Sequence, residues 1–217
     1  DLVDFVNRIV EPVDAMRGDS LPVSAFKDCA DGTYPQGAAA YEKRGVAVYV
    51  PTWKPENCIQ CNNCAFVCPH AAIRPFAMTE EEAAAAPAAT KFTAKPVIKT
   101  NYKFTMAISP MDCMGCTLCV KACPVTKKAL ENAAKTVAAE HPEYDPKTAA
   151  KESAKLASAK SAIEMVLQPT QLDQQAPFDY AVAHVSEKPE LINATVKGSQ
   201  FKQPLLEFSG SCAGCAE

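Results

Sequence analysis

Apolar residues recur at helical spacing in the first twenty residues of the chain, and Gly18 ends the pattern. The residues that share one side are Leu2, Val3, Val6, Ile9, Val10 and Val13. We therefore predict an amphipathic helix that needs a partner surface for its apolar side. From 21 to 40 the chain is rich in Pro, Gly and Asp, which favours an extended connector.

Apolar and polar residues alternate in two later segments, 46–50 and 102–108. The period of two residues is typical of a half-buried strand. The apolar members are Val46, Val48 and Val50 in the first segment and Tyr102, Phe104, Met106 and Ile108 in the second. We predict that these two strands pair with each other in antiparallel fashion.

A capping box predicts a short helix between these strands. Thr79 stands three residues before Glu82, and Pro87 comes soon afterwards. The Ala- and Glu-rich segment should begin at the box and stop at the proline after barely two turns. We expect a solvated surface helix.

Two further helices are predicted after residue 124. The first should run from about 127 to 140. The second begins with Asp145 as N-cap and Pro146 in the first turn, and is expected to continue through Leu167 to near Pro169. Ala, Ser and Lys dominate its body, so it should lie at the periphery.

Composition and charge exclude two kinds of partner. The 217 residues carry a net charge of −3, and the isoelectric point is near 5.7. No apolar run is long enough to cross a bilayer, and no basic cluster marks a nucleic-acid surface. We expect a cytoplasmic protein with neither a membrane nor a nucleic-acid partner.

Two cysteine runs carry the chemistry of the chain. CIQCNNCAFVCP begins at Cys58 and CMGCTLCVKACP at Cys113, so the copies lie 55 positions apart. Both read C-x2-C-x2-C-x3-C-P, the pattern of bacterial ferredoxins that hold two [4Fe–4S] clusters. We predict two clusters and therefore electron transfer.

In that pattern the fourth cysteine of each run ligates the cluster of the other run. The ligands are then Cys58, Cys61, Cys64 and Cys123 for cluster one, and Cys113, Cys116, Cys119 and Cys68 for cluster two. Cys64 and Cys68 serve different clusters although at most about 14 Å of extended chain separates them, or about 6 Å of helix. The two clusters should therefore be neighbours.

Zinc and disulfide bonds are the other common uses of clustered cysteines. Zinc takes four ligands in a tetrahedron, which does not call for a cysteine triplet plus a fourth cysteine beside proline, twice over. Disulfides cross-link distant parts of small secreted domains, and these cysteines are clustered too tightly for such a framework. The spacing favours iron–sulfur clusters over both.

Together these elements predict an α+β fold around a ferredoxin-like module with two [4Fe–4S] clusters and a pseudo-two-fold repeat. The module should span 41–180 with helical insertions. Residues 1–40 are expected to end a preceding domain, and 181–217 to form a linker and the start of another. The chain begins without Met and ends two residues after a CxxC pair, so we expect a piece of a longer protein.

Three cysteines remain outside the two runs. Cys29 stands alone, and a buried structural thiol is expected there because no neighbour activates it. Cys212 and Cys215 form the CxxC pair. Two thiolates cannot complete a [4Fe–4S] site, so this pair is either a redox dithiol or half of a third cluster.

Segments beyond the cysteine runs resemble pyruvate:ferredoxin oxidoreductase, also called pyruvate synthase. They are LPVSAF at 21–26, GTYPQGAAAYEKRGVAVYVPTW at 32–53 and TVKGSQFKQPLLEFSGSCAGC at 195–215. The resemblance implies a piece of a large anaerobic enzyme that uses thiamine diphosphate with Mg to convert pyruvate and coenzyme A into acetyl-CoA, carbon dioxide and two electrons. It also implies that Cys212 and Cys215 are the first two ligands of a third cluster.

The same resemblance implies the role and partners of the chain. Its two clusters would relay electrons one at a time to external ferredoxin or flavodoxin, and the complete enzyme would be a homodimer. No thiamine-binding or CoA-binding motif can be placed here, so the chain alone should only transfer electrons, with no catalytic residue of its own. The Lys- and Ala-rich segment 128–165 resembles an insertion.

Apolar residues beside the cysteines are expected to exclude water from the clusters. They are Ile59, Phe66, Val67, Ile73, Met114, Leu118 and Val120. The alternative function is a free-standing two-cluster ferredoxin, and a third is a subunit of another 2-oxoacid oxidoreductase. The apolar N-terminal helix and the CxxC half-site argue against a free-standing carrier.

Overall fold

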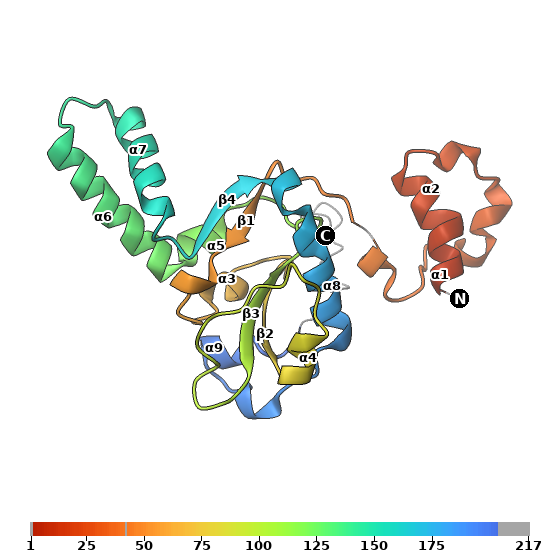
Figure 1. Ribbon diagram of the computed structural model, residues 1–217. Coiled ribbons are helices and arrows are strands. Elements are labelled where there is room, and N and C mark those ends of the chain that lie inside the picture. Colours follow the sequence, from red (N-terminus) through yellow and green to blue (C-terminus); the bar gives the residue numbers. More distant parts are fainter. Residues whose placement is uncertain (1, 42, 204–217) are drawn as a thin grey trace. The chain divides into compact units, whose positions relative to one another are not determined.

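The computed structural model describes residues 2–41 and 43–203 (Figure 1). These residues form two compact units, one that ends at Arg44 and one that comprises Gly45–Gln203. The second unit contains both cysteine runs. Among the described helices, none has the length and apolar character that a membrane span requires.

One continuous helical stretch opens the first unit and confirms the predicted N-terminal helix. It consists of α1, one π-helical turn and α2, at Leu2–Phe5, Val6–Val10 and Glu11–Asp14. Its buried side differs from the prediction, since Phe5 and Ile9 are buried whereas Val3 and Val13 are exposed. The π turn holds more residues than an α turn, so it rotates the apolar stripe.

The next segment is not the extended connector that was predicted. It forms three 3₁₀ helices, at Gly18–Ser20, Val23–Cys29 and Ala38–Tyr41. Cys29 is buried against Phe5 and Ile9, as expected for a structural thiol. Phe26 and Leu21 pack on the same cluster. The segment folds back because these apolar side chains find a partner surface in the helix.

Two antiparallel two-stranded sheets form the centre of the second unit. β1 (Tyr49–Trp53) pairs with β4 (Ile163–Leu167), and β2 (Ile73–Met78) pairs with β3 (Lys103–Ile108). The predicted pairing of the two strands that precede the cysteine runs is therefore wrong. Each of them pairs instead with a strand that comes after the other run. The α+β class is confirmed.

The first strand also begins later than predicted. Val46 and Val48 are exposed, whereas Ala47, Val50 and Trp53 are buried. The prediction from alternation is wrong for Val46 and Val48, because the hydrogen-bonded pairing with β4 begins only at Tyr49.

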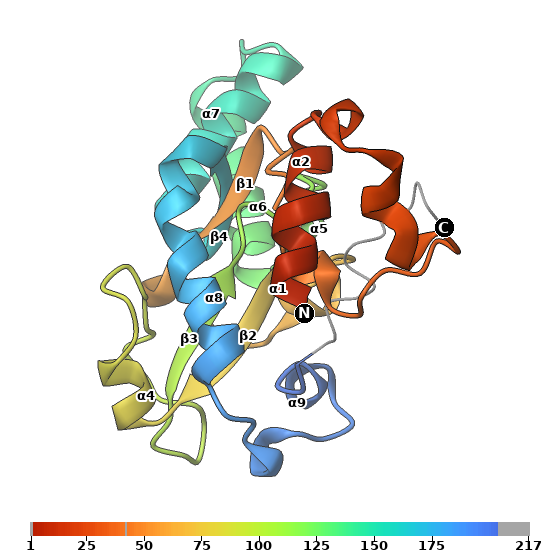
Figure 2. The same ribbon diagram turned by 90° about the vertical axis from the view of Figure 1, so that its right-hand side faces the viewer.

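The β2–β3 sheet is buried on both faces, and its buried residues are mostly apolar, with Arg74 and Thr105 as the polar ones. One face contributes Ile73, Phe104 and Met106 to the largest core cluster. The other face packs against α8 (Gln175–His184), which lies along this sheet (Figure 2). The compact unit thus continues well beyond the second cysteine run.

A helical hairpin projects from this unit (Figure 1). It consists of α6 (Pro124–Glu140) and α7 (Pro146–Ser158), which pack through small side chains at Ala129, Ala133 and Ala157. The first of the two helices and the Asp145 N-cap of the second are confirmed. The predicted continuation of the second helix to Pro169 is wrong, since this helix ends at Ser158 and the chain then enters β4.

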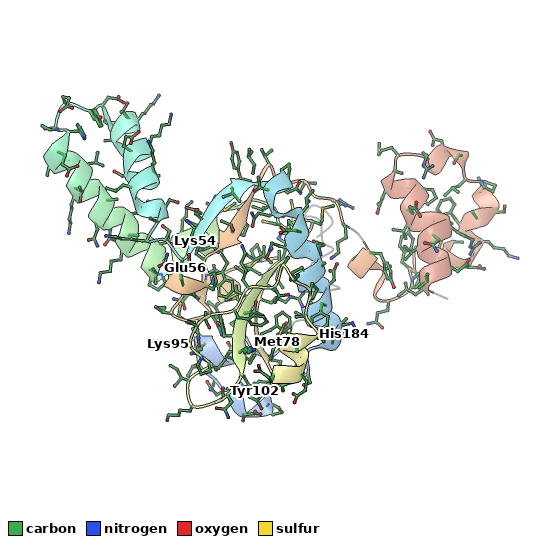
Figure 3. The ribbon with its side chains drawn as sticks, in the orientation of Figure 1. Lys54, Glu56, Met78, Lys95, Tyr102 and His184 are labelled. Atoms are coloured by element: carbon green, nitrogen blue, oxygen red, sulfur yellow. The ribbon has the colours of Figure 1, made fainter. Side chains whose placement is uncertain are left out.

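Contacts from a distant part of the chain explain this early end. Lys54 lies at the base of the hairpin (Figure 3), and its Nζ donates to the carbonyl oxygen of Ser158 at 2.8 Å. Asn57 Nδ2 donates to the carbonyl oxygens of Ala159 and Ser161, each at 3.0 Å. These side-chain donors bind carbonyl oxygens at and just after the end of α7, in place of the N–H groups of a further helical turn. They also align β4 beside β1.

Short helices complete the described chain. The capping box at Thr79 and Glu82 is confirmed, and it opens α4 (Glu80–Ala84). α9 comprises Val196–Ser199. Three 3₁₀ helices lie at Pro55–Asn57, Gln168–Gln174 and Pro189–Leu191.

Candidate metal centre

Both cysteine runs fold into the same kind of loop. The second and fourth residues after the first cysteine have left-handed backbone, with φ of 57° and 62° at Gln60 and Asn62, and 69° and 68° at Gly115 and Thr117. The N–H groups of Gln60 and Gly115 consequently donate to the sulfurs of Cys58 and Cys113, each across 3.4 Å. Such N–H donors favour the thiolate form that metals bind.

The two loops meet different surroundings at the matching positions 60 and 115. A Cβ on Gly115 would lie 3.1 Å from the carbonyl oxygen of Tyr49, a tight contact that favours glycine at this left-handed position. Gln60 instead extends its side chain, and Nε2 donates to Thr93 Oγ1 at 3.0 Å and to the Lys95 carbonyl oxygen at 2.9 Å. Its amide ties the first loop to a neighbouring segment.

Each loop continues into a short helix that carries the third cysteine. These helices are α3 (Asn63–Phe66) and α5 (Leu118–Ala122). The fourth cysteine follows within two residues, and its N–H donates to a carbonyl oxygen of the last turn, from Cys68 to Ala65 and from Cys123 to Val120. The third and fourth cysteines of a run are therefore about one helical turn apart, or about 6 Å.

Two cavities collect the eight cysteines of the runs. Cavity one is lined by Cys58, Cys61, Cys64 and Cys123. Cavity two is lined by Cys68, Cys113, Cys116 and Cys119. Each cavity thus contains three cysteines of one run and the fourth of the other, the same two sets that the sequence predicts. The predicted pair Cys212 and Cys215 lies outside the described residues.

Strand residues supply part of the remaining walls. Cavity one is also lined by Trp53, Met106 and Ile163, and cavity two by Pro51, Ile73 and Met165. Asn62, on the wall of cavity one, is buried and donates from Nδ2 to the Lys197 carbonyl oxygen at 2.8 Å. Sequence reasoning missed Trp53, Asn62 and Ile163 as site residues. For Trp53 and Ile163 the reason is that which strand residues face a cavity depends on the strand pairing, and for Asn62 it is the distant contact with Lys197.

Burial opposes ionisation of these thiols. It is the main reason why the pKa is raised at Cys58, Cys64, Cys68 and Cys113, and raised to about 12 at Cys119. Repulsion between neighbouring thiolates adds to the rise. Four crowded thiolates are stable only beside a compensating positive charge, which iron in a cluster supplies.

The geometry also bears on the alternatives to an iron–sulfur site. The nine cysteines that the structure describes are all free of disulfide bonds. Over the same residues, no three His, Cys, Asp or Glu side chains are grouped so that they could hold a single metal ion. A [4Fe–4S] cluster spreads its thiolate ligands over four iron atoms, so the four cysteines of one cavity need not converge on a single metal ion.

The predicted apolar shield is only partly correct. Ile73 is buried, and Val67 and Val120 are half-buried. Ile59 and Phe66 are 58% and 57% exposed, and Met114 and Leu118 are also exposed. Ile59 and Met114 nevertheless line cavities one and two, whereas Phe66 and Leu118 line neither, so the prediction is wrong for Phe66 and Leu118. The loops direct their cysteines and N–H groups inward, so these two side chains point outward.

Comparisons with known proteins agree with this site. The family described as "4Fe-4S dicluster domain" matches residues 57–127, and the EKR family, described as a domain of unknown function, matches 1–47. Pyruvate-flavodoxin oxidoreductase of Klebsiella pneumoniae is 44% identical over 99% of this chain and 15% of its own length. Pyruvate:ferredoxin oxidoreductase of Moorella thermoacetica is 40% identical over 99% of this chain and 16% of its own length.

The chain matches a segment of these pyruvate oxidoreductases along nearly its whole length. The resemblance found in the sequence is thereby confirmed. The pyruvate dehydrogenase [NADP(+)] of Cryptosporidium parvum is likewise 37% identical over the whole of this chain, which covers 10% of that protein. The chain spans only about 15% of the length of the curated pyruvate-flavodoxin relatives.

Proposed function

We propose that each four-cysteine cavity holds one [4Fe–4S] cluster. The ligands would be Cys58, Cys61, Cys64 and Cys123 for cluster one, and Cys113, Cys116, Cys119 and Cys68 for cluster two. One observation carries this proposal: three cysteines of each run share a cavity with the fourth cysteine of the other. The inward N–H groups of Gln60 and Gly115 support it, because hydrogen bonds to thiolate sulfur stabilise ligands of this kind.

The chain would then act as an electron relay inside a pyruvate oxidoreductase. Bound clusters of this type each accept and release one electron. Cys64 and Cys68 line different cavities but are joined by a single helical turn, so this segment of backbone would hold the two centres as fixed neighbours. Transfer between them would need no movement of the chain.

The rest of the relay is proposed from the relatives. Their names assign them oxidation of pyruvate, and we propose the same substrate for the protein to which this segment belongs. Thiamine diphosphate with Mg, a third cluster that begins at Cys212 and Cys215, and assembly as a homodimer are further parts of this proposal. A reducing, cytoplasmic location fits thiols that must stay free to bind iron.

The final electron acceptor would be external ferredoxin or flavodoxin. Relatives named for flavodoxin, for ferredoxin and for NADP(+) all match this same segment. We therefore propose that parts outside it select the acceptor. A free-standing ferredoxin remains the alternative function, and similarity to large enzymes through residues 1–47 and beyond 127 disfavours it.

We further propose a pseudo-two-fold relation between the halves of the cluster module. β1 and β3 each lead into a cysteine run, and β2 and β4 each come after one. We also propose the division 1–40, 41–180 and 181–217. The compact unit Gly45–Gln203 begins near the first of these boundaries but continues past the second, at 180.

Paired substitutions test the ligand assignment. The unsubstituted chain, purified without oxygen, should contain about eight irons in its two clusters. Cys68→Ser combined with Cys113→Ser removes two ligands from one proposed cluster, so about four irons should remain. Cys68→Ser combined with Cys58→Ser removes one ligand from each cluster, so iron should fall to near zero.

The two double variants carry the same number of substitutions, so each is the matched control for the other. The reverse result, with more iron retained in the variant altered at positions 58 and 68, would show that each run binds its own cluster. A colourless, zinc-loaded chain without acid-labile sulfide would contradict the proposed function as a whole.

A further inference from the structure

Trp53 presents an unpaired hydrogen-bond donor to cavity one. This tryptophan is 5% exposed, and its ring packs edge-on against Phe104 with centroids 6.1 Å apart. The indole Nε1 is buried, and no described residue accepts a hydrogen bond from it. Buried donors without an acceptor are rare in native structures, so this N–H calls for a partner that the polypeptide does not supply.

The position of the ring indicates what that partner is. Trp53 and Cys58 both line cavity one, and the other strand residues around them, Met106 and Ile163, offer no side-chain oxygen or nitrogen as acceptor. The indole N–H therefore lies in the wall of a cavity whose side-chain acceptors include four cysteine sulfurs.

Cavity two has no equivalent indole. Trp53 is paired with Ile163 across β1 and β4, and in the other sheet Ile108 is paired with Ile73. Ile108 lies 55 positions after Trp53, which is the spacing of the two cysteine runs. The matching position in the second half is thus an aliphatic residue without a donor. The polar side chains that line cavity two are His70 and Thr117, in its loops.

We propose that Trp53 donates its indole N–H to a sulfur atom of the cluster in cavity one and makes that cluster easier to reduce. The inference rests on the proposed clusters. Reduction adds negative charge to a cluster, and a hydrogen bond to its sulfur stabilises the more negative state. The two centres of the relay would then differ in potential because one half of the module carries an indole and the other an aliphatic side chain.

Redox titration of the intact protein tests this proposal. Trp53→Phe keeps an aromatic ring in the core but removes the N–H. The variant should keep the iron and sulfide of both clusters, and the potential of one centre should shift to a more negative value while the other stays unchanged. Repeating the substitution in the variant that lacks Cys68 and Cys113 identifies the shifted centre as that of cavity one.

Ile108→Val is the matched control, since it alters the corresponding position in the other half without removing a donor. It should leave both potentials unchanged. Unchanged potentials in a fully loaded Trp53→Phe variant would overturn the proposal, and so would an equal shift of cluster one in the control. In either case the iron content would still support the proposed clusters.

A second measurement needs no substitution and applies even if Trp53→Phe fails to load. Trp53 is the only tryptophan of this chain. Pulsed EPR of reduced cluster one, in the chain labelled with indole-¹⁵N tryptophan, should show a hyperfine coupling to that nitrogen. Its absence from a spectrum in which cluster one is reduced would overturn the proposal.

Discussion

The two halves of the cluster unit differ in the length of chain between each cysteine run and the next strand. After Cys68 the chain enters β2 at Ile73, whereas after Cys123 it forms the whole α6–α7 hairpin before β4 begins at Ile163. Both β2 and β4 nevertheless pair with the strand that leads into the other run. The strand partner, and not the length of the intervening chain, decides where β4 lies.

Contacts at the base of the hairpin explain how the unit accommodates it. Thr126 Oγ1, in the first turn of α6, accepts from the Ile163 N–H at 3.2 Å and donates to the Ile163 carbonyl oxygen at 3.0 Å. Lys54 bonds to the end of α7 and also forms an ion pair with Glu164, at 2.6 Å. The end of the hairpin therefore lies beside its beginning, where Thr126 contacts Ile163. Closing a longer loop between these two points costs little additional entropy.

A different interaction stabilises the first half: a buried ion pair beyond the end of β2. Lys188 Nζ lies 3.0 Å from both carboxylate oxygens of Glu82, and the two side chains are only 8% and 16% exposed. Ser186 donates to the same carboxylate through its N–H and its hydroxyl. This network joins α4 to the segment after α8.

Breaking that pair should have the largest effect. Lys188→Met removes the cation and leaves the Glu82 carboxylate buried without its main partner. We expect a loss of about 3 kcal/mol in the free energy of unfolding, because an uncompensated buried charge is costly. Anaerobic urea unfolding of the cluster-loaded chain measures it, and combining the change with Glu82→Gln should recover part of the loss.

Lys54→Met is the matched control in the second half. The Lys54–Glu164 pair is about one-quarter exposed, with side-chain accessibilities of 23% and 26%, so its removal should cost only about 1 kcal/mol. If Lys54→Met lost as much unfolding free energy as Lys188→Met, or more, the expected difference between the two ion pairs would be contradicted. The base of the hairpin would then contribute as much as the buried network.

Acid should weaken the first half selectively, with an intermediate effect. Burial alone would raise the pKa of Glu82, but hydrogen bonds from Ser186, Thr79 and Lys188 outweigh it and lower the pKa from 4.5 to about 2. A lowered folded-state pKa contributes stability above pH 4.5 that is lost as pH falls toward 2. After allowance for solvent screening, this contribution is about 2 kcal/mol.

Comparison with Glu82→Gln isolates this contribution from acid damage to the clusters. The parent chain should exceed the variant in unfolding free energy at pH 7, and the difference should shrink as pH is lowered below 4.5. A difference that stays constant between pH 7 and pH 3.5 would show that the carboxylate does not titrate as proposed.

The fold could be predicted from the sequence where its causes are local. The capping box at Thr79 and the N-cap at Asp145 depend on residues a few positions away, and both were predicted. The segment Ile163–Leu167 was predicted as helix, because the cause of its strand conformation lies with Lys54, Asn57 and β1, more than 100 residues earlier. Sequence periodicity does not contain that information.

In the candidate site, too, the features with local causes could be predicted from the sequence. Cysteine spacing predicted which thiols would share each cavity, because the pattern itself encodes the crossover of the fourth cysteine. Most of the other wall residues could not be predicted in this way. Trp53 reaches cavity one through the pairing of β1 with β4, whereas Phe66 and Leu118, between the cysteines, line neither cavity and are exposed.

Loss of the hairpin cap should have the smallest effect. Asp145 accepts hydrogen bonds from the N–H groups of Lys147 and Thr148 at 2.9 and 3.3 Å, so Asp145→Ala leaves the first turn of α7 uncapped. We expect a local cost of about 1 kcal/mol, seen as about five-fold faster hydrogen exchange of the α7 amides.

Lys151→Ala, at an exposed position of the same helix, should not change exchange in this way. Because Thr126 and Lys54 hold β4 independently of the hairpin tip, exchange in β4 and the iron content should be unaffected by either change. Faster exchange in β4 of the Asp145→Ala variant would mean that the hairpin does help to position that strand, and the two halves would then differ in more than the length of their connections.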